Sequence, residues 1–89
     1  MKPIAKTENL SIRRDTGELF IEDIVNSKFI HLNPTSAYVW EKCDGRHEPS
    51  EIAQEMGEEL GVSVSESVIA MALNKLRNED LVDMELSLA

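Results

Sequence analysis

The sequence is poor in the residue types that make disulfides, metal sites and membrane spans. It has a single cysteine, Cys43, so no disulfide can form within the chain, and one cysteine with two histidines does not make a structural zinc site. No apolar run approaches the roughly 18 residues of a membrane span, and the N-terminal "MKPIAKTENL" lacks the apolar stretch of a signal peptide. We therefore expect a cytoplasmic protein with no metal site and no membrane contact.

Basic residues are also scarce. Nine lysines and arginines stand against seventeen aspartates and glutamates, which gives a net charge of -8. Such a chain repels the phosphate backbone of nucleic acids. The charge therefore favours a protein that has no nucleic-acid partner.

Length and composition predict one small globular domain, residues 1–89, with its core at about 9–82. A chain of 89 residues buries only about 60 to 65% of its unfolded surface, and its content of 42% hydrophobic and 29% charged residues is that of a folded protein. The sequence contains no phosphate-binding loop, G-x-S-x-G or H-E-x-x-H pattern. We expect neither a cofactor nor an enzymatic activity of the chain's own.

The N-terminal part favours a three-stranded antiparallel sheet. Alternating apolar and polar residues predict strands at 10–14, 18–24 and 28–32, and "DTG" and "VNS" supply the turns between them. In the last strand Ile30 and Leu32 alternate with Phe29 and His31, so one face can meet a core. Residues 1–8 are expected to form a loose arm.

The next segment predicts a short helix that supports the sheet. Asn33 can cap it, Pro34 suits its first position, and Gly45 can close it in the left-handed conformation. Trp40 lies on its apolar stripe, where burial contributes on the order of 3 kcal/mol. Cys43 shares that stripe, so we interpret it as a buried hydrophobic residue rather than a nucleophile.

Two further helices are predicted, from Pro49 to Gly61 and from a serine cap to about Glu79. Gly57 is unfavourable inside the first of them. Ser63 with Glu66 forms a potential capping box for the second, and Ser65 is the competing cap. Residues 81–87 alternate and form either a short strand or a wing. The order predicts an α+β fold: a winged helix-turn-helix with an N-terminal three-stranded antiparallel sheet followed by three helices.

The stretch "FIHLNPTSAYVWEKCDGRHEPSEIAQEM" closely resembles the PqqD family, small proteins of pyrroloquinoline quinone synthesis. A looser match extends the resemblance over about residues 18–82. This chain differs from the family in having Glu48 in place of the usual threonine and Ala72 in place of a larger apolar residue. The matching residues are Leu32, Asn33, Thr35, Ala37, Trp40, Cys43, Asp44, Gly45, Arg46, Glu51 and Ile52, and more loosely Leu73, Leu76, Arg77, Leu81 and Val82.

The resemblance implies a RiPP recognition element, which binds the leader segment of a ribosomally made precursor peptide and presents it to a modifying enzyme. A radical SAM protein is the expected enzyme, and the product, whether pyrroloquinoline quinone or another, stays open. If strands follow in sequence, 28–32 lies at a sheet edge and can accept the leader as an added strand. The predicted binding residues are Lys28, Phe29, Ile30, His31 and Leu32 on that strand and Val68, Met71, Ala72 and Lys75 on the last helix.

Two other functions stay open at this point. A winged helix also suits a DNA-binding regulator, although the last helix offers only Lys75 and Arg77 near acidic residues. An acidic run on the middle helix suits either plain solvation or docking of a basic partner, as in an enzyme-docking subunit. The sequence does not decide whether two copies form a homodimer. That run comprises Glu48, Glu51, Glu55, Glu58 and Glu59.

Overall fold

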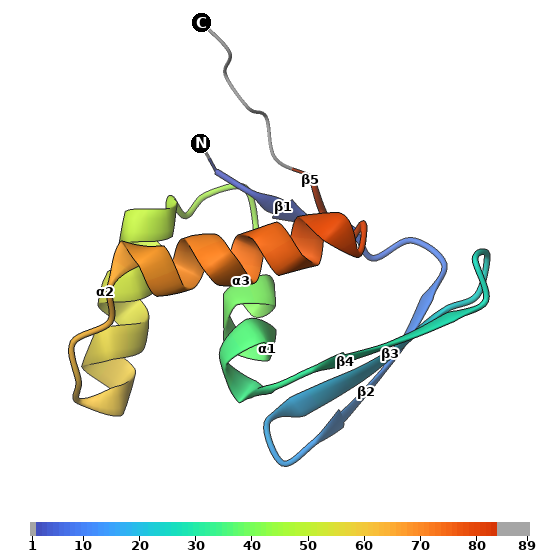
Figure 1. Ribbon diagram of the computed structural model, residues 1–89, viewed down its shortest axis with the longest axis horizontal. Coiled ribbons are helices and arrows are strands. Elements are labelled where there is room, and N and C mark those ends of the chain that lie inside the picture. Colours follow the sequence, from blue (N-terminus) through green and yellow to red (C-terminus); the bar gives the residue numbers. More distant parts are fainter. Residues whose placement is uncertain (1, 84–89) are drawn as a thin grey trace, which may run out of the picture.

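The computed structural model describes residues 2–83, which form a three-stranded sheet, a separate two-stranded sheet and three helices (Figure 1). This arrangement confirms the predicted α+β fold. In chain order the elements are β1 (Ile4–Ala5), β2 (Leu10–Asp15), β3 (Glu18–Asp23), β4 (Lys28–Leu32), α1 (Pro34–Glu41), α2 (Pro49–Leu60), α3 (Glu66–Asn78) and β5 (Val82–Asp83).

The main sheet has the order β2-β3-β4 and is antiparallel throughout. Its register places Ile12 opposite Ile21 and Ile21 opposite Ile30, so these three residues form one row across the sheet. Ile21 and Ile30 are buried, because side chains at alternate positions of a strand point to the same face. That face, with Leu19 and Leu32, covers the core, and the other face is open to solvent.

Helix α1 packs against both the main sheet and α3. Asn33 caps it as expected, since its Oδ1 accepts a hydrogen bond from the Ser36 N–H at 2.8 Å. Trp40 is buried, and its Nε1–H donates to the Leu81 carbonyl oxygen at 2.8 Å. The sequence predicts that helix α1 supports the sheet. Through Trp40 it also fixes the segment that follows α3.

The predicted end of α1 is wrong. The helix stops at Glu41, and Gly45 lies beyond it with a φ of +78°. The Gly45 N–H donates to the Pro3 carbonyl oxygen at 3.0 Å, and a Cβ on this residue would lie 3.0 Å from the Ile4 side chain. Gly45 therefore makes room for the N-terminal segment instead of closing the helix.

The N-terminal arm is also not loose. Ile4 and Ala5 pair with Asp83 and Val82 in a separate two-stranded sheet, and the Ala5 N–H donates to the Cys43 carbonyl oxygen at 2.7 Å. Isolated alternation over two residues is too short a signal to predict such a strand. Of the strand or wing expected at 81–87, Val82–Asp83 is a strand, and residues 84–87 lie outside the described part of the chain.

Helices α2 and α3 are joined by residues 61–65 and pack against each other. Gly57 is explained by this connection, because a Cβ there would lie 2.7 Å from the Val62 carbonyl oxygen. The cap of α3 is Ser65, the competing candidate, so the capping box at Ser63 is wrong. Within residues 2–83 no helix is both long and apolar enough to cross a membrane.

Candidate functional site

In the part of the chain that the structure describes, the edge of the main sheet along β4 has no pairing strand. Among residues 2–83, β4 pairs only with β3, while β1 and β5 pair with each other elsewhere. In an antiparallel ladder alternate residues direct both their N–H and C=O groups to the same side. Two or three of the five residues of β4 therefore present about four to six backbone groups to a further strand.

A flank of α3 faces this edge. Lys28, the first residue of β4, forms an ion pair with Glu79, the C-cap of α3, with 3.6 Å between Nζ and Oε2. Helical spacing puts Lys75, four residues before Glu79, on the same flank. In the described part of the chain α3 packs closely on α1, α2 and β5, and β4 on β3 and α1, but α3 and β4 do not pack closely on each other.

The predicted binding residues of α3 differ in how accessible they are. Ala72 is buried, whereas 42% of Val68 and 74% of Met71 is exposed. By helical geometry Met71 lies further from the core than Val68, at the outer margin of the flank. A chain placed beside β4 can therefore contact Val68 and Lys75 directly, and Met71 through its long side chain.

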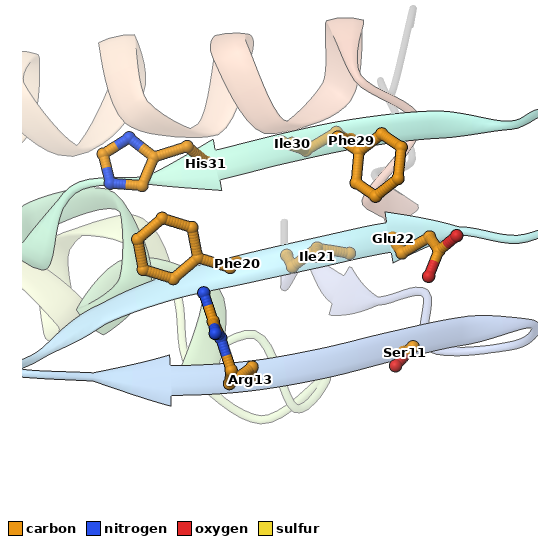
Figure 2. A pocket seen from close by; sticks show the side chains of 8 residues that line it. All are labelled: Ser11, Arg13, Phe20, Ile21, Glu22, Phe29, Ile30 and His31. Carbon is orange, nitrogen blue, oxygen red and sulfur yellow. The ribbon is translucent and has the colours of Figure 1, made fainter.

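The five predicted residues of β4 separate into two sets. Ile30 and Leu32 are buried in the core, so they can offer only backbone groups to a partner. Phe29 and His31 project from the solvent-facing side of the sheet, and α3 passes behind that side (Figure 2). Helical spacing from Glu79 thus places Val68 and Lys75 on the flank of α3, whereas Phe29 and His31 lie on the solvent-facing side of the sheet.

A sequence profile described as "Coenzyme PQQ synthesis protein D (PqqD)" matches residues 15–82. The chain belongs to the PqqD family.

Two solved structures share the fold of this PqqD family member. TbiB1 in complex with the TbiA(beta) leader peptide matches with a TM-score of 0.71 at 15% sequence identity. Lasso peptide synthetase B1 complexed with the leader peptide matches with a TM-score of 0.74 at 18% identity. Each match covers 94% of this chain and 100% of the solved one. No curated protein sequence matches the chain.

The solvent-facing side of the sheet carries a hollow of about 390 Å³ that the sequence reasoning missed. Its two sides are columns of cross-strand neighbours, which Figure 2 shows side by side. One column contains Arg13, Phe20 and His31, and the other contains Ser11, Glu22 and Phe29. The alternation within the strands that predicts a buried face also predicts this second, outward-facing set of side chains.

The first column is a continuous stack. The Arg13 guanidinium lies 5.0 Å from the centre of the Phe20 ring, and the rings of Phe20 and His31 are 4.9 Å apart. The His31 Nε2 is 2.7 Å from the Glu18 Oε1. These contacts hold His31 in place. By contrast, 82% of Phe29 in the second column is exposed.

Cys43 is buried, and its Sγ donates to the Val39 carbonyl oxygen at 3.1 Å. Burial raises the pKa of the Cys43 thiol to about 12, and the nearby Asp44 carboxylate adds to the rise. Since the thiolate is the reactive form, this geometry supports the structural interpretation of Cys43.

His47 joins the loop before α2 to that helix. Its Nδ1 lies 2.9 Å from the Asp44 Oδ1 and its Nε2 lies 3.0 Å from the Glu55 Oε2. The hydrogen bond to Asp44 raises the pKa of His47, and the same bond lowers the pKa of Asp44. In the part of the chain that the structure describes, no group of three or more His, Cys, Asp or Glu side chains is arranged to hold a metal ion.

The acidic run of α2 is exposed for the most part. Only Glu55 in this run has basic neighbours within residues 2–83, namely His47 and, at 4.0 Å, Lys42. Glu51 accepts a hydrogen bond from the Glu48 N–H at 3.0 Å, so it helps to begin the helix. These contacts are local, and they assign no docking role to the run.

Proposed function

We propose that this PqqD family member binds the leader segment of a ribosomally made precursor peptide as a further strand beside β4, and presents it to a modifying enzyme. The observation that carries the proposal is the open edge of β4, lined by the flank of α3, in a chain of this family. The two solved proteins of the same fold were each captured with a leader peptide, which supports the same partner class.

The energetics require side-chain contacts as well as strand pairing. About four to six backbone hydrogen bonds contribute about 0.5 to 1.5 kcal/mol each, whereas ordering each peptide residue costs about 1 to 2 kcal/mol. These terms roughly cancel. Binding near 1 μM, about -8 kcal/mol, therefore needs two or three buried apolar side chains of the leader. Val68 and Met71 supply exposed apolar surface beside the edge for this purpose.

We propose the same binding residues as from the sequence. The residues of β4 pair with the leader, and the residues of α3 contact its side chains. Residues 28–32 supply the pairing edge, and Val68 and Lys75 form the wall, with the buried Ala72 between them at its base and Met71 at its margin. Ile30 and Leu32 contribute backbone groups alone. A rigid edge reduces the ordering that binding requires, and the capped helix α1 fixes the end of β4 at Asn33.

The proposed role is non-catalytic. The chemistry belongs to the partner enzyme, for which a radical SAM protein is the candidate that the family suggests. The protein would lie in the cytoplasm with its partners, and it would need no cofactor of its own. The Cys43 thiol is buried and its pKa is raised, so it is a poor nucleophile, which supports a non-catalytic role.

The experiment is a titration of isotope-labelled protein with a leader peptide from a precursor gene adjacent to the gene of this chain. We expect backbone amide shifts in β4 and along Val68, Ala72 and Lys75, with a Kd in the micromolar range, and none with a scrambled leader. Shifts confined to α2, or no shifts, would count against the proposal. A short DNA duplex serves as the second control.

A DNA-binding regulator is not supported by the same observations. Helix α3 begins with Glu66, and its two basic residues are Lys75 and Arg77, of which Arg77 donates a hydrogen bond to Asn74 at 3.0 Å. With a net charge of -8, the chain offers little neutralisation of phosphates.

A further inference from the structure

We propose that the leader is recognised on both faces of the sheet, and that Phe29 selects a bulky apolar leader residue on the face away from α3. The inference rests on the proposed function and adds a side-chain preference at one leader position, which backbone pairing alone does not provide. It starts from the most exposed apolar side chain of the edge strand: 82% of Phe29 is open to solvent. An aromatic ring this exposed on an unpaired edge strand usually marks a surface that a partner covers.

The geometry of an added strand makes the assignment specific. Side chains directly opposite each other on paired strands point to the same face and lie about 4.5 to 5.5 Å apart at Cβ. A leader residue opposite Phe29 therefore continues the column of Ser11, Glu22 and Phe29 (Figure 2). Its neighbour opposite Ile30 points to the other side, toward α3. This alternation holds for either direction of the leader.

The chemistry of the outward residue follows from what surrounds Phe29. Phe29 lines the hollow with most of its ring exposed, and a leader side chain opposite it would cover part of that ring. A branched or aromatic side chain buries the most apolar area there. An acidic side chain is disfavoured, because Glu22 stands next to Phe29 in the column. By contrast, the residue opposite His31 meets a ring that Glu18 and Phe20 already contact.

A leader strand is a better occupant than a second copy of the chain. Two copies that met through their outer faces would bring together two proteins of net charge -8, with Glu22 of each near the contact. The hollow is also continuous with the open edge of β4, since both contain residues 29–31. One extended peptide therefore covers the edge and Phe29 together.

The test begins with a displayed library of linear peptides of about 12 residues, selected on the full 89-residue protein. The consensus peptide is synthesised, and its register on β4 is assigned from contacts between peptide and protein protons. We expect an apolar preference at alternate positions facing α3 and a separate bulky apolar preference opposite Phe29. Phe29→Ala is expected to weaken binding about tenfold. Leu60→Ala, at a 65% exposed site on α2, is the matched control and should change nothing.

A double-mutant cycle separates this inference from the proposed function. Phe29→Ala and alanine at the outward peptide position should be non-additive, whereas Phe29→Ala and alanine at an inward position should add. If the peptide occupies β4 but the residue opposite Phe29 is unbiased and Phe29→Ala binds within twofold of wild type, the inference fails and the proposed function stands. If no selected peptide contacts β4, both fail. Dimerisation that Phe29→Ala abolishes would also overturn the inference, because the ring would then be covered by a second copy.

Discussion

Replacing Gly57 by alanine tests how the connection between α2 and α3 packs against α2. Helix propensity alone predicts that Gly57→Ala stabilises the protein by about 1 kcal/mol. The added Cβ, however, would lie 2.7 Å from the Val62 carbonyl oxygen, which is backbone and cannot rotate away. Overpacking of this kind costs about 1 to 3 kcal/mol. The shift also strains the hydrogen bond from the Val62 N–H to the Gly57 carbonyl oxygen, now 3.1 Å.

The expected net effect is a loss of about 1 to 2 kcal/mol in the free energy of unfolding, measured by urea denaturation. The control is Ala70→Gly at an exposed position of α3, which calibrates the propensity difference in the same protein and should cost about 1 kcal/mol. If Gly57→Ala instead raises the stability by the amount that Ala70→Gly lowers it, the close approach of Val62 is refuted.

Three further predictions concern the supports of the site. Trp40→Phe should lower the free energy of unfolding by about 2 to 3 kcal/mol, because it removes packing and the hydrogen bond to Leu81; a loss below about 0.5 kcal/mol in urea denaturation would contradict that bond. Cys43, with a thiol pKa of about 12, should react with iodoacetamide at pH 8 far more slowly in the folded than in the unfolded protein, as mass spectrometry would show; equal rates would contradict its burial. The raised pKa of His47 gives stability that is present below its unfolded value of about 6.5 and lost as pH rises through the folded value, while the lowered pKa of Asp44 gives stability that is lost as pH falls through its folded value. The stability difference between wild type and His47→Gln should therefore be largest near pH 5 to 6 and shrink by pH 9, and a difference that grows toward pH 9 would reverse the assignment.

Much of the fold could be predicted because local signals and tertiary packing agree. The three strands, the Asn33 cap and the Pro34 start of α1 each follow from nearby residues. The errors occur where distant segments decide. The pairing of Ile4–Ala5 with Val82–Asp83 joins the two ends of the described chain, and the roles of Gly45 and Gly57 depend on Ile4 and Val62. No local pattern contains that information.

The candidate site was predicted in a similar way. Sequence order was enough to place residues 28–32 at an edge, and helical spacing selected a flank of α3 whose role in binding stays a prediction. What spacing could not give was the relation between the two elements. The structure shows that Phe29 lies on the solvent-facing side of the sheet, where it borders a hollow lined by residues of β2, β3 and β4.

The most direct test of strand addition is a scan in which each backbone nitrogen of the bound leader is methylated in turn. An N-methyl group removes one hydrogen-bond donor and leaves the side chain unchanged. If the leader pairs with β4, the loss of affinity should alternate with a period of two along the segment opposite residues 28–32, with about three- to tenfold weakening at every second position. Uniform tolerance of methylation, or losses without that period, would contradict the account.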